Sequence, residues 1–134
     1  MKLVDTDVII WYMRGNEKAA EVLDNMNNII LSAVTYMELI QGMRNKAELS
    51  SLETTLTTWK ATIFPINEEI SDHAVNLVKQ HFHSHSLMLA DALIAATALH
   101  YQLPLLTGND KHYRIITDLN LEKFKVESND EKKQ

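Results

Sequence analysis

The sequence predicts a three-layer α/β/α fold with a central parallel sheet of four to five strands. Short apolar runs recur along the chain, and most of them are followed by a longer segment with helical periodicity. Alternation of this kind is typical of right-handed strand–helix–strand crossovers, which place helices on both faces of a parallel sheet. A length of 134 residues without cysteine indicates one domain that contains no disulfide.

Five apolar runs are the candidate strands, and most are bounded by a proline, a polar turn residue or a charged side chain. They span residues 2–5, 29–31, 62–64, 104–107 and 123–126. We expect residues 1–126 to form the domain. The charged segment 127–134 contains no apolar residue, so we expect it to be a disordered tail.

Apolar residues at spacings of three and four predict the helices between these strands. The predicted helices span 6–13, 17–26, 34–44, 46–60, 68–82 and 89–100. In the helix over 68–82, the residues expected to face inward are Ile70, Ala74, Leu77, Val78 and Phe82. The helix over 89–100 is apolar nearly all round, as a buried helix would be.

Charge and hydropathy narrow the classes of function. No apolar stretch approaches the ~20 residues that span a bilayer, and no signal-length hydrophobic segment precedes Asp5. We therefore expect a cytoplasmic protein. The formal net charge of −5 disfavours nucleic-acid binding driven by protein charge alone, although bound divalent ions would offset it.

Four carboxylates stand beside apolar sequence, namely Asp5, Glu38, Asp91 and Asp110. In open α/β sheets the carboxyl ends of the strands form the ligand-binding edge, and this topology can bring all four acids there. Two carboxylates ~4 Å apart repel by about 4 kcal/mol at an effective dielectric of 20. Mg²⁺ or Mn²⁺ would relieve that repulsion, since both prefer oxygen ligands.

Most of these acids also have a structural interpretation, but the helix dipole would stabilise Asp91 by only about 0.3–1 kcal/mol. Asp5 can cap the helix that follows it. Asp7 lies in the first turn of that helix, where negative charge is favourable, so we expect it to have a structural or supporting role. Thr35 and Glu38 have the spacing of a capping box, which from spacing alone is as good an interpretation as a metal ligand. Asp110 lies in a Gly-Asn-Asp sequence that is ordinary for a turn.

Two other chemistries are weaker candidates. His81, His83 and His85 could bind zinc, but histidines near a helix C-terminus are also favoured by the helix dipole. The spacing of Asp5 and Asp7 resembles the opening of haloacid-dehalogenase-type phosphatases, in which the first Asp is a nucleophile. Such enzymes also need a later lysine and a glycine-rich acidic pair, and the chain holds only three glycines.

Together the acidic segments resemble the PIN domain family, and most closely the VapC toxins of prokaryotic toxin–antitoxin pairs. The matching segments are residues 4–10, 32–39 with Gly42, 90–98 and 105–113. They occur in the same order and cover the chain from its start to about residue 126.

The resemblance implies the toxin of a type II toxin–antitoxin system, a Mg²⁺- or Mn²⁺-dependent endoribonuclease that cleaves single-stranded RNA with a metal-activated water. It also implies a homodimer and a VapB-type antitoxin partner. Asp5, Glu38 and Asp91 match the family's metal-binding acids. The fourth acid varies in position among relatives, and Asp110 is the acid available here.

Further positions follow from the same resemblance. The residues expected to support the site are Thr6, Thr107 and Asn109. Independently of the resemblance, Arg14, Arg44 and Arg114 each follow an acidic motif, so together with Lys111 they are candidates to hold the RNA backbone, with solvated surface as the alternative. A catalytically inactive PIN domain that acts as a binding module stays open as an alternative.

Overall fold

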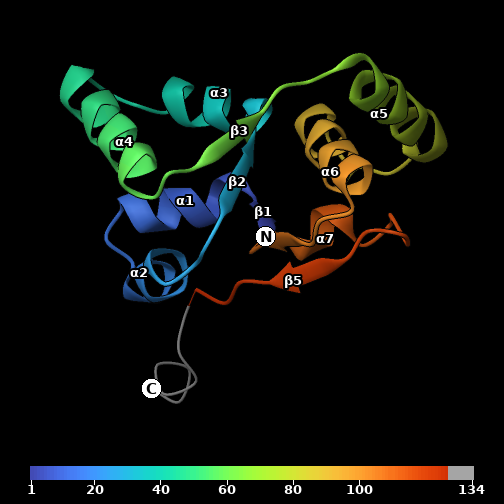
Figure 1. The fold of residues 1–134 in the computed structure, drawn as a ribbon. Coiled ribbons are helices and arrows are strands. Elements are labelled where there is room, and N and C mark those ends of the chain that lie inside the picture. Colours follow the sequence, from blue (N-terminus) through green and yellow to red (C-terminus); the bar gives the residue numbers. More distant parts are fainter. Residues whose placement is uncertain (127–134) are drawn as a thin grey trace.

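The computed structural model describes residues 1–126, so the tail predicted over 127–134 lies outside the described residues. The strands are β1 (Lys2–Val4), β2 (Ile29–Ser32), β3 (Thr62–Phe64), β4 (Leu105–Thr107) and β5 (Leu121–Lys123). The helices are α1 (Thr6–Met13), α2 (Glu17–Asp24), α3 (Ala33–Gln41), α4 (Lys46–Thr58), α5 (Glu68–His81), α6 (Leu89–Tyr101) and α7 (Asp110–Tyr113). Figure 1 shows their arrangement around the sheet.

The sheet is parallel throughout, with the strand order β3-β2-β1-β4-β5. Leu3 of β1 is in register with Ile30 of β2 on one side and with Leu105 of β4 on the other. The chain builds outward from β1 to β3, then crosses back to place β4 on the other side of β1. The crevice between β1 and β4 is therefore the topological switch point, where open α/β sheets bind ligands.

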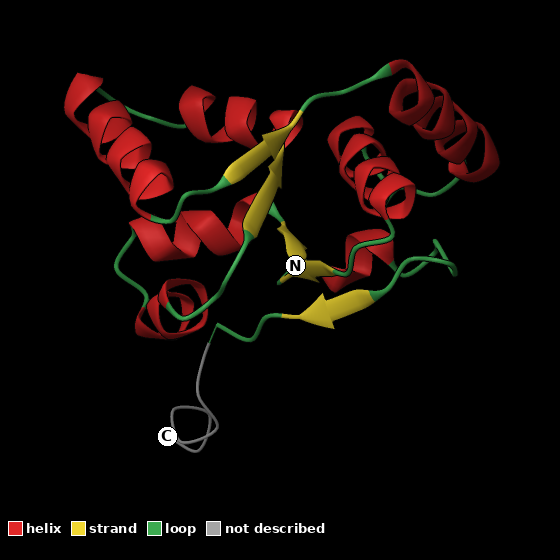
Figure 2. Ribbon diagram, viewed as in Figure 1, coloured by secondary structure: helices red, strands yellow, loops and turns green. Residues whose placement is uncertain are grey.

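Alternating side chains of the central strands pack into two separate hydrophobic cores, because successive residues of a strand point to opposite faces. Leu3 and Leu105 pack with α5, α6 and α7, whereas their neighbours Val4 and Leu106 pack with α1, α2 and α4. Figure 2 shows the two groups of helices on either side of the strands. The predicted α/β/α architecture is confirmed.

The C-terminal part of the sheet differs from the prediction. The last strand spans Leu121–Lys123 and not 123–126, because its pairing with β4 sets Leu105 opposite Leu121. Phe124 follows the strand as a buried residue, and its N–H donates to the carbonyl of Thr107 at 2.8 Å. The short helix α7 was not predicted, since four residues are too few to show helical periodicity.

The buried face of α5 is narrower than the sequence suggested. Ile70, Ala74 and Leu77 are buried, but Val78 is 38% exposed and Phe82 is 68% exposed, so their inward placement was wrong. Val78 lies at the edge of the buried stripe, about 100° around the helix from Leu77, and Phe82 caps the helix end.

The helix α6 is buried as predicted along most of its length, with Ala92 to Ala98 nearly all inside. Its first residue, Leu89, is 71% exposed. Within residues 1–126, no helix has both the length and the apolar character needed to cross a membrane.

Candidate active site

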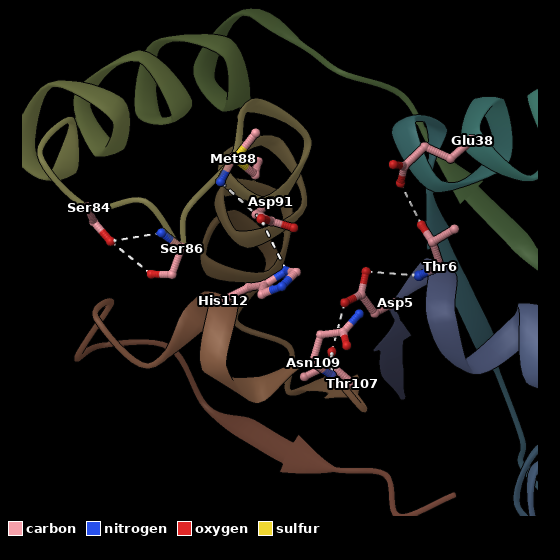
Figure 3. Close-up of polar contacts among 10 residues, drawn as sticks. All are labelled: Asp5, Thr6, Glu38, Ser84, Ser86, Met88, Asp91, Thr107, Asn109 and His112. Atoms are coloured by element: carbon pink, nitrogen blue, oxygen red, sulfur yellow. Dashed lines mark hydrogen bonds and ion pairs between the residues drawn. The ribbon is translucent and has the colours of Figure 1, made fainter.

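Asp5 lies at the carboxyl end of β1 and is 5% exposed. It is the N-cap of α1, where its Oδ1 accepts the Thr6 N–H at 2.8 Å. Its Oδ2 accepts the hydroxyl of Thr107, the last residue of β4, at 2.7 Å. The capping interpretation is therefore right, but it uses one oxygen only. The other oxygen ties β1 to β4 across the switch point (Figure 3).

The environment of Asp5 favours a neutral carboxyl or a bound cation. Burial raises the pKa of Asp5 and the charge of Asp91 raises it further, while the hydrogen bonds from Thr107 and Thr6 lower it. No Lys, Arg or His forms an ion pair with Asp5 in the described part of the chain. A buried carboxylate without a cationic partner is unfavourable unless something compensates its charge.

Glu38 reaches toward the same edge of the sheet from α3. This helix begins at Ala33, and its N-cap Ser32 accepts the Val34 N–H at 3.0 Å. The capping box proposed for Glu38 is therefore wrong, because the helix starts one turn earlier than that motif requires. Instead, Glu38 Oε1 accepts the hydroxyl of Thr6 at 2.7 Å.

The Thr6 hydroxyl joins α1 to α3 at two points. Besides its bond to Glu38, it lies 3.0 Å from Oγ1 of Thr35, which is fully buried. Thr35 was not among the residues that the sequence assigned to the site, although its place three residues before Glu38 puts it on the same helix face.

Asp91 is the third residue of α6, and it makes the capping contact that the sequence had suggested for Glu38. Its Oδ2 accepts the Met88 N–H at 3.0 Å and lies 3.5 Å from Nδ1 of His112. The side chain of Asp91 is 14% exposed. In Figure 3, Asp91 and Glu38 lie on opposite sides of Asp5.

Asp7 faces the turn that follows β4. Its Oδ2 accepts the Gly108 N–H at 2.9 Å, whereas its Oδ1 is buried and has no hydrogen-bond partner among the described residues. Burial, and then the charge of Asp5, raise the pKa of Asp7 to about 6. The supporting role expected for Asp7 stays a prediction, and this contact provides a basis for it.

Asp110 differs from the other acids because it has cationic neighbours. Its Oδ2 lies 3.1 Å from Nε of Arg114, and its Oδ1 lies 3.8 Å from Nζ of Lys123. Asn109 just before it is exposed, and its N–H donates to Oγ1 of Thr107 at 3.0 Å. Asp110 is therefore charge-compensated, which weakens the argument that it needs a metal.

Tyr113 is a second residue that sequence reasoning had not assigned to the site. It is the last residue of α7, and its side chain is fully buried. Burial and the charges of Asp5 and Asp91 raise its pKa, so its hydroxyl stays protonated. In the sequence, Tyr113 only follows a run of polar residues, and nothing there indicates that its side chain is buried beside the site.

A groove runs beside Glu38 between α1, α3 and α4. It has a volume of about 550 Å³, and its lining includes Arg14 and Arg44. Arg44 pairs with Glu48 at 2.6 Å, and Arg14 lies over the Trp11 ring at 5.9 Å. The fold therefore brings two of the predicted RNA-binding arginines together with one predicted metal ligand.

The acids are the right type of ligand for a divalent ion, but their side chains are not arranged closely around one point. Within residues 1–126, no three His, Cys, Asp or Glu side chains are grouped closely enough to hold a metal, and this includes the histidines at the end of α5. Asp5, Glu38 and Asp91 offer carboxylate oxygens, the ligands that Mg²⁺ and Mn²⁺ prefer. The buried and uncompensated carboxylate of Asp5 is the feature that fits such an ion best.

Fold and site together define a parallel α/β protein with carboxylates around the switch point of its sheet. Comparison with known proteins agrees, since residues 2–117 match the model of the PIN domain. Ribonuclease VapC19 of Mycobacterium tuberculosis is 33% identical over 124 residues, which cover 89% of this chain and 97% of that protein. Ribonuclease VapC1 of Haemophilus influenzae is 31% identical over 128 residues, 87% of this chain and 92% of that protein.

Solved structures give the same result. A toxin–antitoxin complex from Klebsiella pneumoniae superposes with a TM-score of 0.75 at 28% identity, covering 89% of this chain and 95% of that one. VapBC-1 from nontypeable Haemophilus influenzae superposes with a TM-score of 0.72 at 27% identity, covering 91% and 96%. The chain belongs to the PIN domain family, in its VapC-type branch. This membership gives no support to the phosphatase alternative.

Proposed function

We propose that this chain is the toxin of a type II toxin–antitoxin system and cleaves single-stranded RNA with the help of Mg²⁺ or Mn²⁺. The names of its relatives support the reaction, since both VapC1 and VapC19 are called ribonucleases. The observation that best supports the metal dependence is the environment of Asp5. This buried carboxylate has no cationic partner in the described residues, and the charge of Asp91 helps to raise its pKa.

Asp5, Glu38 and Asp91 would hold the ion, and Asp110 would assist if its ion pairs open. A divalent ion supplies Lewis-acid chemistry there, because it lowers the pKa of water and stabilises charge on the phosphodiester. Each of the three acids is oriented by a neighbour: Asp5 by Thr107, Glu38 by Thr6, and Asp91 by the Met88 N–H. Fixed ligand orientation of this kind supports metal affinity.

A decisive experiment uses antitoxin-free protein and defined single-stranded RNAs. We expect cleavage in Mg²⁺ or Mn²⁺ that stops when EDTA is added and returns when the ion is restored in excess. The products should carry a 5′-phosphate and a 3′-hydroxyl. Cleavage that persists in EDTA would refute the metal dependence. An absence of cleavage combined with tight binding of an antitoxin chain would favour the inactive binding module.

The RNA backbone would lie along the groove that contains Arg14 and Arg44. Each phosphate contact to single-stranded nucleic acid contributes about 0.7 to the slope of log K against log salt. We therefore expect Arg14→Ala and Arg44→Ala to weaken RNA binding and to lower that slope by about this amount each. Lys111 and Arg114, both exposed on or just after α7, would contact RNA on the other side of the site.

Fluorescence anisotropy with a labelled RNA at several salt concentrations measures this slope. Lys79→Ala is the control, because Lys79 is exposed on α5 and does not line the groove. An unaltered slope in both arginine variants would exclude them as backbone contacts.

The proposed partners are a VapB-type antitoxin and a second copy of this chain. The structural relatives include one described as a toxin–antitoxin complex and one described as VapBC-1, which supports an antitoxin partner. RNA as the substrate implies action in the cytoplasm.

A further inference from the structure

The junction of β1 and α1 holds the turn after β4 through two adjacent contacts. Asp5 accepts the hydroxyl of Thr107 at 2.7 Å, and Asp7 accepts the N–H of the next residue, Gly108, at 2.9 Å. Residue 109 completes the turn, where the Asn109 N–H donates to Oγ1 of Thr107 at 3.0 Å. The Thr107 hydroxyl therefore accepts the Asn109 N–H and donates its own proton to Asp5.

The second contact is close enough to determine which residue can occupy position 108. A Cβ on Gly108 would lie 2.5 Å from Oδ2 of Asp7, a separation that real Cβ atoms essentially never show. The other nearby group, the Phe124 carbonyl, would lie at an ordinary 3.5 Å. Gly108 does not have positive φ. A larger residue at position 108 would therefore displace the Asp7 carboxylate from the N–H that it accepts, so the glycine suits the approach of Asp7 and is not needed for the backbone conformation.

Asp7 also has a feature that lowers the stability of the folded protein. Its Oδ1 is buried without a hydrogen-bond partner in the described residues, and an unsatisfied buried polar atom destabilises the folded state. The side chain makes one strong contact, and that contact leads to the turn that carries Thr107. Residues that violate a stability rule in this way are commonly kept for a functional reason.

We propose that Asp7 is a positioning residue of the active site and that Gly108 is its partner. Asp7 anchors the backbone of the turn, and the anchored turn holds the Thr107 hydroxyl on Asp5. Without the anchor, the turn would move and Asp5 would lose its fixed orientation. The catalytic part of this inference rests on the proposed ribonuclease activity, whereas the anchor itself does not.

The anchor is tested by a double-mutant cycle on the unfolding of the protein. The variants are Asp7→Ala, Gly108→Ala and the double variant, compared by urea denaturation. We expect Gly108→Ala to lower the unfolding midpoint in the parent protein, because its Cβ displaces the carboxylate from the N–H of residue 108. In the Asp7→Ala background, the same change should have little effect, because the carboxylate is gone. Additive effects of the two substitutions would overturn the anchor.

The positioning role is tested by steady-state cleavage of a defined RNA. We expect Asp7→Ala to lower kcat by about 10–100-fold, the range typical of residues that orient a metal ligand, with KM little changed. Asp7→Asn should recover most of the lost kcat, because its amide oxygen can still accept the Gly108 N–H. A purely structural role would not give recovery that follows this one hydrogen bond.

The outcomes separate this inference from the proposed function. Parent-like kcat in Asp7→Ala would overturn the positioning role, and so would an Asp7→Asn variant as slow as Asp7→Ala. If the parent protein cleaves no RNA in any divalent ion, the proposed function fails and the positioning role fails with it. The unfolding cycle would then still decide whether Asp7 anchors the turn.

Discussion

Replacement of Asp91 by asparagine is expected to abolish RNA cleavage and to leave the fold intact. Asparagine has the size of aspartate, and its amide oxygen can accept the Met88 N–H that caps α6. The substitution therefore removes the charge and keeps the cap. Loss of a residue that only supports a metal ligand costs about 10–100-fold, so we expect a larger loss in kcat for a ligand itself. Cleavage rates and thermal melts of the purified variant measure the two effects.

Asp72→Asn is the matched control for this prediction, since Asp72 is an exposed acid on α5 and is not among the site residues. It should cleave RNA like the parent protein. Full activity of Asp91→Asn with unchanged metal dependence would remove Asp91 from the site.

The second large effect concerns stability. Asp7→Asn should make the metal-free protein more stable at neutral pH. A pKa raised from 3.8 to about 6 means that the folded state binds the Asp7 proton more tightly than the unfolded chain does. Stability linked to this group is therefore fully present below about pH 4 and is lost as the pH rises through about 6. The loss corresponds to about 2–3 kcal/mol at pH 7.

Asparagine carries no charge at any of these pH values and can keep the bond to Gly108. The expected gain in the free energy of unfolding is about 2–3 kcal/mol at pH 7.5 and close to zero at pH 4. Urea denaturation in EDTA at both pH values measures it. A gain of equal size at both would show that the charge of Asp7 is not its cause.

The sequence was most informative where local pattern and topology agree. Asp5 follows a short apolar strand and precedes a helix, so its place at the sheet edge could be predicted from these two neighbouring segments alone. The parallel direction of the strands follows from the alternation of strand and helix. The buried face of α6 could be predicted because its apolar residues leave few other orientations.

Other features depend on details that local pattern does not determine. Either Ser32 or Thr35 could have begun α3, and the one-turn difference reversed the capping interpretation of Glu38. The bond between Asp7 and Gly108 joins residues 101 apart in the chain, so no local periodicity reports it. Val78 was misplaced because one residue of rotation separates the buried stripe of α5 from its exposed face.

The central claim is that the acids at this sheet edge hold a divalent ion. Titration of Mn²⁺ into antitoxin-free protein by isothermal calorimetry, with Asp91→Asn measured in parallel, tests it without reference to any RNA. We expect the parent protein to bind Mn²⁺ and the variant to bind it at least about tenfold more weakly. Equal affinities in the two proteins, or no binding by the parent, would contradict the account.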